Sequence, residues 1–259
     1  MENKQAHAGN ENYDENFYRL QKDGSFKSAA TILPVVTKFI RPRSVVDVGC
    51  GVGTWLVAWK QLSGGGINVY GIDGDYVDSS QLFIDKKFFH PANLEERVNL
   101  ERRFDLAMTV EVAEHLTPAR ADSFVEDLTK LSDVILFSAA IPAQGGVNHV
   151  NEQWQSYWAE KFLRLGYVGI DCIRPSVWNN GNVEFWYRQN IFLYVKSTEL
   201  YRYPELQDFY LKHRDGMIFN VVHPEMWISK IVNFQNSYNQ LRNAFVNLQN
   251  QHAKLDQRK

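Results

Sequence analysis

The sequence contains little cysteine and no long apolar run. Its two cysteines, Cys50 and Cys172, are too few in 259 residues for a disulfide framework. No apolar stretch approaches the ~18 residues that a membrane span requires. The opening residues, MENKQAHAGNENYDEN, are polar and acidic, unlike a secretory signal. We therefore expect a soluble protein of a reducing, cytoplasmic compartment, without a membrane span.

An excess of positive charge is missing as well. The 28 Lys and Arg residues stand against 30 Asp and Glu, a formal charge of -2, which gives no electrostatic reason to expect nucleic acid as a partner. Apolar residues, in contrast, make up 44% of the chain and aromatic residues 14%, which is ample for a packed core. A chain of this length fits one good-sized α/β domain with appended segments.

The middle of the chain alternates short apolar strands with helices. Strands are expected at 45–48, 68–73, 88–89, 104–110 and 134–139. Helices are expected at 28–40, through Trp55, Leu56, Trp59 and Leu62, and at 118–131. Such βαβ units predict a parallel sheet with helices on both faces.

The pattern changes after Pro142. A helix at 151–165 is followed by strands at 167–173 and 189–196 with no helix between them, so these two strands should pair antiparallel. The predicted fold is therefore α/β: a Rossmann-like, doubly wound sheet of seven strands, mostly parallel with an antiparallel last strand.

Four segments follow from this pattern. Residues 28–198 form the α/β domain, and residues 199–226 are a linker or accessory segment without clear periodicity. Residues 1–27 form an N-terminal tail that contains aromatic residues among charges; we interpret it either as a lid over the ligand site or as a free tail. Residues 227–259 form a helix.

This last helix carries two interleaved heptad series. Its apolar positions are Ile231, Phe234, Tyr238, Leu241, Phe245, Leu248, His252 and Leu255. The series predict a coiled coil that joins copies of the chain or tethers it to a fused partner; an amphipathic helix folded back on the domain is the alternative. The chain ends in Gln-Arg-Lys without a capping signal, as expected for part of a longer protein.

Three glycines, Gly49, Gly51 and Gly53, stand between the first strand and its helix. Glycine is needed where the backbone turns sharply or lies against a ligand. The dinucleotide fingerprint requires a further glycine at the position of Thr54. Asp47, before the glycines, suits the ammonium group of an amino acid and would repel a pyrophosphate.

Asp73 completes this pattern at the end of the second strand, twenty residues after Gly53. Its carboxylate is placed to accept both hydroxyls of a ribose. An adenosine that bears a charged amino acid is S-adenosylmethionine (SAM). A tight strand-to-helix turn without a ligand is the alternative interpretation.

The glycine stretch resembles that of class I SAM-dependent methyltransferases. The stretch Glu111-Val112-Ala113-Glu114-His115-Leu116 is similar to the acidic motif after the fourth strand in the same superfamily, and the resemblance covers residues 28–198. It implies SAM as cofactor and S-adenosylhomocysteine as product. The cofactor-binding residues that we expect are Asp47, Gly49, Cys50, Gly51, Gly53, Asp73, Gly74, Asn93, Leu94, Glu111, Val112 and His115. Asn93 departs from the aspartate that often faces the adenine amino group, although its carbonyl can accept the same hydrogen bond.

The methyl acceptor is expected beyond the fifth strand, at the carboxyl edge of the sheet. His149 is the candidate general base because its ordinary pKa of ~6.5 suits proton removal near neutral pH, and Glu152 would orient it. His115 is the rival base, and a helix-capping role for His149 is the alternative. Substrate contacts are expected from Gln144, Asn151, Trp186, Tyr187 and Arg188. His149 and Glu152 are spaced i, i+3, but no Cys/His cluster or paired aspartates complete a ligand set, so no metal site is predicted. A divalent cation, which some O-methyltransferases use, stays open.

The stretches 138–146, 149–154 and 186–190 resemble a bacterial subset of the superfamily associated with polysaccharide and sugar-modifying gene clusters. We therefore expect O-methylation of a sugar, glycan or glycolipid precursor in bacterial surface-polysaccharide synthesis. Methylation of another small molecule, such as a secondary metabolite, is the second hypothesis. The third is a non-catalytic SAM-binding scaffold that oligomerises through the last helix.

Overall fold

The computed structural model describes residues 24–256, with side chains described to residue 249. The chain divides into two compact units, residues 1–221 and 222–259. The predicted lid falls almost wholly on residues 1–23, which lie outside the described part. Within residues 24–256, no helix combines the length and the apolarity that crossing a membrane requires.

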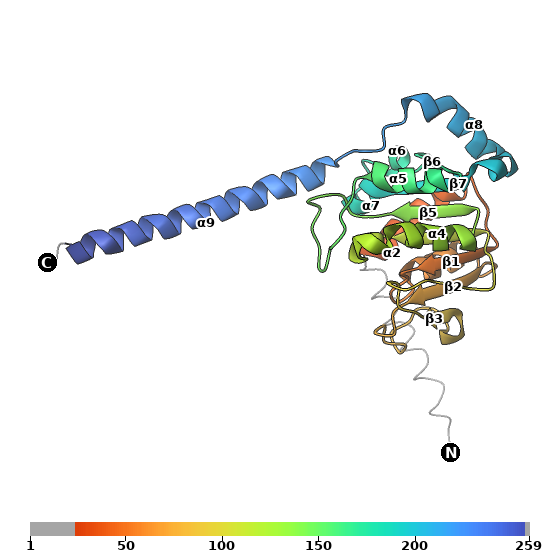
Figure 1. Cartoon of the computed structure of the whole chain (residues 1–259), viewed down its shortest axis with the longest axis horizontal. Helices are drawn as coiled ribbons and strands as arrows, with labels where there is room; N and C mark the ends of the chain where they lie inside the picture. The colour runs from red at the N-terminus through yellow and green to blue at the C-terminus, as the bar shows by residue number, and fades with distance from the viewer. Residues whose placement is uncertain (1–23, 257–259) are drawn as a thin grey trace, which may run out of the picture. The chain divides into compact units, whose positions relative to one another are not determined.

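The first unit is built on a seven-stranded sheet with the order β3-β2-β1-β4-β5-β7-β6 (Figure 1). Its strands are β1 Ser44–Val48, β2 Asn68–Asp73, β3 Phe89–Pro91, β4 Leu106–Val110, β5 Val134–Ser138, β6 Tyr167–Ile170 and β7 Phe192–Lys196. Neighbours from β3 to β5 pair parallel, whereas β7 pairs antiparallel with both β5 and β6. The predicted fold class is confirmed.

Helices cover both faces of this sheet. The α-helices of the first unit are α2 Gly24–Val36, α3 Thr54–Leu62, α4 Ala121–Leu131, α5 Gln155–Arg164, α6 Arg174–Val177, α7 Phe185–Asn190 and α8 Pro204–His213. Short 3-10 helices are η1 Lys86–Phe88, η2 Ala113–His115, η3 Pro118–Arg120, η4 Ser197–Arg202 and η5 Arg214–Gly216. Strand side chains alternate between the two faces, so each face has a core of its own.

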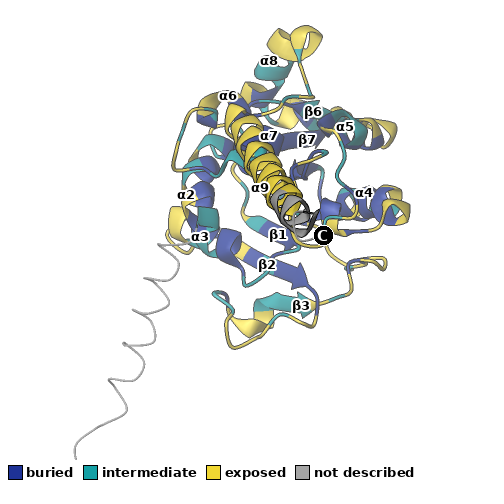
Figure 2. Cartoon of the chain, turned by 90° about the vertical axis from the view of Figure 1, so that its left-hand side faces the viewer, coloured by how far each residue is buried: buried dark blue, intermediate teal, exposed yellow. Residues whose placement is uncertain are grey.

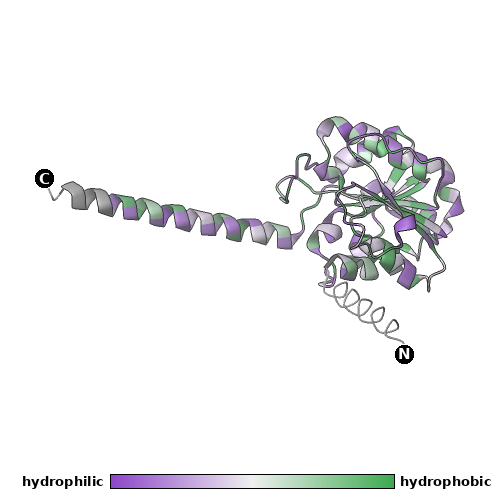
Figure 3. Ribbon diagram, turned by 90° about the horizontal axis from the view of Figure 1, so that it is seen from below, coloured by the Kyte–Doolittle hydropathy of each residue, from purple (hydrophilic) through white to green (hydrophobic). Residues whose placement is uncertain are grey.

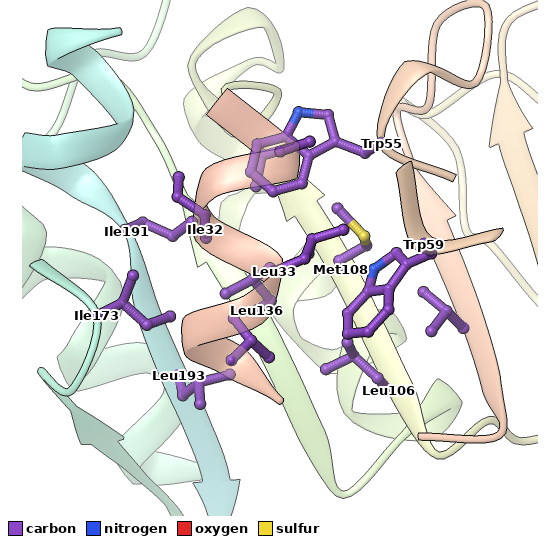
Figure 4. Close-up of a cluster of buried hydrophobic side chains, with 14 of the residues drawn as sticks. Ile32, Leu33, Trp55, Trp59, Leu106, Met108, Leu136, Ile173, Ile191 and Leu193 are labelled. Atoms are coloured by element: carbon purple, nitrogen blue, oxygen red, sulfur yellow. The ribbon is translucent and has the colours of Figure 1, made fainter. Parts of the chain in front are cut away.

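One core packs under α2, α3, α6 and α7, and the other under α4 and α5. Figure 4 shows the first: Leu33 of α2 and Trp59 of α3 lie against Met108 of β4. The neighbouring Ala107 faces the second core, where it joins Phe124 and Phe162. Strands buried on both sides hold the sheet rigid, as the dark central strands of Figure 2 show, and thereby fix the positions of the loops at its carboxyl edge.

Two sequence-based predictions about the end of the sheet are wrong. The segment between β6 and β7 contains α6 and α7, although no helix was predicted there, and residues 189–190 belong to α7 instead of a strand. The run FWYRQN has aromatic residues typical of strands, but local propensity yields to tertiary context. In α7 the polar side chains of Gln189 and Asn190 find buried hydrogen-bond partners, and β7 starts only at Phe192.

The segment 199–226 contains more structure than the sequence indicated. Its helix α8 has Pro204 in the first turn, where a missing N–H costs nothing. Leu206 is buried, and Phe209 and Tyr210 pack against the first core. This i, i+3, i+4 spacing is a short helical pattern.

The second unit contains one long helix, α9 Pro224–Asp256. Apolar residues recur along it between polar ones, as the alternating colours in Figure 3 show. Large apolar side chains at heptad spacing are all exposed: Trp227, Ile231, Phe234, Tyr238, Leu241, Phe245 and Leu248. The side chains of His252 and Leu255 lie outside the described part. The predicted helix is confirmed, and the coiled coil stays a prediction.

Candidate active site

A pocket of about 910 Å³ opens at the carboxyl edge of the parallel strands. Its wall includes many of the residues expected to bind the cofactor: Gly49, Gly51, Asp73, Gly74, Asn93, Leu94, Glu111, Val112 and His115. The remaining wall residues are Asp75, Tyr76, Glu95, Leu116, Val147 and Asn148. The loops after β1, β2, β3, β4 and β5 thus meet in one cavity, because parallel strands end at the same edge.

The loop after β1 depends on glycine for steric reasons. Gly49 has φ 85° and Gly51 has φ 53°, a left-handed conformation that other residues rarely adopt. A Cβ at Gly49 would collide with the side chain of Val112. A Cβ at Gly51 would meet no atom within 4 Å, so the space over this residue is open. The backbone here can therefore lie directly against a ligand.

Asp73, at the end of β2, is held by backbone N–H groups. One oxygen accepts from Gly51 N at 2.6 Å and the other from Gly74 N at 2.7 Å. The second oxygen also accepts from the hydroxyl of Tyr76 at 2.6 Å. A hydroxyl group thus already occupies one oxygen of the carboxylate that the sequence predicted to hold the ribose.

Asp47 lies inside β1 and behind the glycine loop, and it is not part of the pocket wall. It is 1% exposed, and its Oδ1 has no hydrogen-bond partner among the described residues. Burial, followed by the charge of Asp73, raises its pKa well above the usual range. Cys50 and Gly53 likewise lie outside the wall: Cys50 is buried, and Gly53 precedes α3.

The two residues expected at the adenine, Asn93 and Leu94, differ in the contacts that their side chains already make. Leu94 is buried at the wall. The amide oxygen of Asn93 accepts from Glu95 N at 3.1 Å, and its amide nitrogen donates to Glu96 at 3.3 Å. Asn93 therefore stabilises its own turn, and a hydrogen bond to adenine would be an additional one.

Glu111, directly after β4, stands in a buried polar network. Its φ of 54° is unusual for a residue with a side chain, and its N–H donates to Ser138 O at 3.0 Å. Its carboxylate accepts from Gln144 at 2.7 Å and from Asn190 at 3.2 Å. Burial raises the pKa of Glu111, while these hydrogen bonds lower it. Gln189 donates to Gln144 at 3.2 Å and extends the network.

Glu114, one turn further on, is fully buried, and neither carboxylate oxygen has a hydrogen-bond partner among the described residues. Burial, followed by the charge of Glu111, raises its pKa well above the usual range. Its backbone oxygen accepts from Val150 N at 2.9 Å and Asn151 N at 3.0 Å. These bonds tie the loop after β5 to the motif after β4.

His149 is brought to Glu114 and His115 by that connection. The rings of His115 and His149 meet edge to face with centroids 4.8 Å apart. Burial, followed by the charge of His149, lowers the pKa of His115. The Nδ1 of His149 lies 2.9 Å from a Glu152 oxygen, so the expected pairing of these two residues is present. Glu152 also accepts from Ala143 N at 2.8 Å and Gly145 N at 2.6 Å.

The residues expected to contact the substrate are not part of the pocket wall. Tyr187 of α7 is buried and packs edge to face on Trp55 at 5.2 Å, and Trp186 packs against the same core. Arg188 is buried and donates to Trp178 O at 3.2 Å. Asn151 is buried and accepts from Gln153 at 3.0 Å. The fifth residue, Gln144, is buried in the Glu111 network.

Sequence reasoning gave no role to Glu114, Gln189 or Asn190. Glu114 stands within a quoted motif, but nothing local indicates that its side chain points inward. Asn190 was assigned to a strand, where its neighbours differ. The available signal was a run of uncharged amides before an apolar strand, which is unusual for a chain entering a core.

Comparisons with known proteins identify the family to which the chain belongs. Residues 20–164, more than half of the 259, match the family model described as a methyltransferase domain. The chain belongs to this methyltransferase family. Its fold is that of the class I enzymes, and SAM, the cofactor expected from the sequence, is the methyl donor of that class. Comparison with curated proteins gives no match.

Several solved structures share the fold. An O-methyltransferase family protein from Burkholderia thailandensis has a TM-score of 0.50 and 14% identity, over 74% of this chain and 61% of that protein. The methyltransferase domain of bacterial CtHen1 has a TM-score of 0.50 and 15% identity, over 67% of this chain and 98% of that domain. Magnesium protoporphyrin IX methyltransferase from Synechocystis PCC 6803, with bound S-adenosylhomocysteine, has a TM-score of 0.48 and 16% identity, over 72% of this chain and 95% of that protein. The chain thus spans less than two thirds of the length of the Burkholderia thailandensis protein.

Proposed function

We propose that this methyltransferase moves the methyl group of SAM (an EC 2.1.1 reaction) to a hydroxyl of a sugar, glycan or glycolipid precursor in bacterial surface-polysaccharide synthesis. One observation carries the proposal: the glycine loop and Asp73 share a pocket with His115 and Asn148, the residue before His149. The pocket thus adjoins a histidine–carboxylate pair suited to a hydroxyl acceptor. The density of polar side chains in residues 144–153 supports an acceptor rich in hydroxyl groups.

The cofactor and the acceptor would be held by different residues. Asp73 would accept the ribose hydroxyls of SAM, and the open backbone at Gly51 would let the methionine part lie close. Methyl transfer is an in-line displacement at carbon, so positioning contributes much of the rate. Glu152 holds Nδ1 of His149, and Nε2, which lies over Gly146, would take the acceptor's proton.

Calorimetric titration of SAM and S-adenosylhomocysteine is the first test. We expect micromolar binding that Asp73→Ala and Gly51→Val abolish, while Asp78→Ala, an exposed carboxylate outside the pocket wall, leaves it unchanged. No binding by folded wild-type protein would overturn the proposal. Methyl transfer from labelled SAM to nucleotide sugars and glycan termini then tests the acceptor. Turnover only with other small molecules would favour the second hypothesis, and binding without turnover the scaffold.

We also propose that α9 joins a second copy of the chain. Its exposed apolar residues follow a heptad from Trp227 to Leu248, and Lys230 and Arg242 are the only charged residues in that interval. Two such helices can therefore pair with little charge repulsion. Light scattering should show an oligomer that the double variant Leu241→Lys, Phe245→Lys dissociates, with SAM binding retained. A monomeric wild type would overturn this assembly.

A further inference from the structure

The Glu114 carboxylate is fully buried beside the pocket. Neither oxygen has a partner with good hydrogen-bond geometry among the described residues, and the nearest donors are the backbone N–H groups of Glu114 itself and Ala140. A buried carboxylate without a partner costs several kcal/mol in general, and proteins normally compensate it with a cation or a hydrogen-bond donor. Glu111, whose carboxylate accepts from Gln144 and Asn190, precedes it by three residues. A cation beside Glu114 would therefore offset a buried negative charge.

Two imidazoles converge on this carboxylate. One ligand atom from each of Glu114, His115 and His149 can be chosen so that all three lie within 4.8 Å of one another. Ligand atoms around one ion stand roughly 3–4 Å apart, because metal–ligand bonds are about 2.0–2.2 Å long. Side-chain shifts of less than about 1 Å would therefore close the set. Backbone bonds from Val150 and Asn151 to Glu114 already hold the two segments together.

The surroundings of His149 add an independent observation. Glu152 contacts Nδ1 at 2.9 Å and is itself fixed by the N–H groups of Ala143 and Gly145. A carboxylate on one ring nitrogen fixes the tautomer and orients the other nitrogen toward a metal, as is usual for histidine ligands. His115 lies on the pocket wall, so an ion at this place would face the pocket.

We infer that Glu114, His115 and His149 form a divalent metal site whose open positions face the pocket and take the oxygen of the acceptor. Two imidazoles and one carboxylate suit Mn²⁺, Fe²⁺, Co²⁺ or Zn²⁺. No metal site was predicted from the sequence, since the three residues come from two segments that only the fold brings together. The inference rests on the proposed function and changes one part of it: Nε2 of His149 holds the ion instead of the proton.

The chemistry of transfer then has a defined balance. The ion lowers the pKa of a bound hydroxyl, and the O–H bond breaks with release of its proton to solvent. The acceptor oxygen forms a bond to the methyl carbon as the S–C bond of SAM breaks. The electron pair of the broken S–C bond stays on sulfur, and S-adenosylhomocysteine leaves with its sulfur as a neutral thioether. Glu152 positions His149 and does not touch the reacting atoms.

Metal binding can be measured without turnover. Chelator-treated full-length protein is titrated with Mn²⁺, and separately with Zn²⁺, by calorimetry in the absence of SAM. We expect one saturable site in the wild type, weakened at least tenfold by Glu114→Gln, His115→Gln and His149→Gln. Glu152→Gln should weaken it tenfold to a hundredfold. The control His213→Gln changes a histidine of α8 and should leave binding unchanged.

Thermal unfolding of each variant, with and without metal, shows that the fold is retained. Wild type should melt at a higher temperature with Mn²⁺, and the three ligand variants should not respond. Absence of saturable binding by folded wild type would overturn the inference, as would binding that survives both Glu114→Gln and His149→Gln. SAM titrations on the same samples separate the two claims: SAM binding without metal binding rejects only the metal site.

Discussion

Two neighbouring regions at the carboxyl edge of the sheet are held together by different kinds of contact. The cofactor loop, residues 47–53 together with Asp73, is fixed by glycine conformation and by backbone N–H groups that donate to a carboxylate. The proposed acceptor cluster, defined as Glu111, Glu114, His115, His149 and Glu152, is fixed by side-chain contacts and by backbone bonds between the loops after β4 and β5. The first region depends on steric fit, whereas the second depends on polar and charged side chains. Substitutions should therefore disturb the two parts in different ways.

The largest effect is expected at Gly49. Gly49→Val combines a left-handed φ with a collision against Val112, which should reduce SAM affinity by more than about 100-fold or prevent folding, since left-handed backbone alone costs roughly 1–2 kcal/mol. Calorimetry and circular dichroism measure the two outcomes. Gly65→Val is the control. Gly65 has φ 87°, and a Cβ added to it would meet no atom within 4 Å, so this variant isolates the cost of the left-handed backbone. Equal effects at both positions would show that the collision is unimportant.

A smaller effect is expected in the Glu111 network. Asn190→Leu removes the amide that donates to Glu111 and Gln144, which should lower the free energy of unfolding by about 1–3 kcal/mol and slow methyl transfer, while SAM affinity changes little. Urea denaturation and initial rates check this. The double variant with Gln144→Leu should cost less than the sum of the two single variants, because they share partners. Strict additivity would contradict a connected network.

The third prediction concerns pH. Burial raises the folded-state pKa of Glu114, so the stability from its protonation is full below the unfolded value near 4.5 and is lost as pH rises through the folded value. In metal-free protein, Glu114→Gln should therefore gain on the order of 1 kcal/mol over wild type at pH 8 and lose this advantage toward pH 4. Denaturation at several pH values measures the difference. Glu160→Gln, an exposed change on α5, should show none.

The smallest effect is expected at Tyr76. Its hydroxyl occupies an oxygen of Asp73, and the residue is 81% exposed, so displacement should cost about 0.5–1.5 kcal/mol. Tyr76→Phe should therefore tighten SAM binding several-fold, whereas Asp73→Asn weakens it. Calorimetry of both variants decides. A loss of affinity in Tyr76→Phe would mean that the hydroxyl contacts the cofactor itself.

The difference between these two regions also explains which parts of the fold and of the site could be predicted from the sequence. The alternation of strands and helices, the antiparallel last strand and the glycine loop were predictable, because they depend on local pattern: apolar strands, glycines after the first strand, and Asp73 at the end of the second. The acceptor cluster was not, because Glu114 acquires its neighbours only when the loop after β5 folds back on η2. Asn190 was missed for a related reason: the aromatic residues before it are typical of a strand, yet α7 packs them into the core.

The reversed direction of β7 has a consequence for how this enzyme could diversify. Since β7 runs against β5 and β6, the chain leaves β6 and enters β7 at the same edge where the pocket opens. The stretch between these strands, α6 and α7 included, therefore returns to that edge with Asn190, whose amide donates to Glu111 on the pocket wall. Sequence changes near Asn190 would thus reach the pocket through Glu111, while the strands that carry the glycine loop stay untouched.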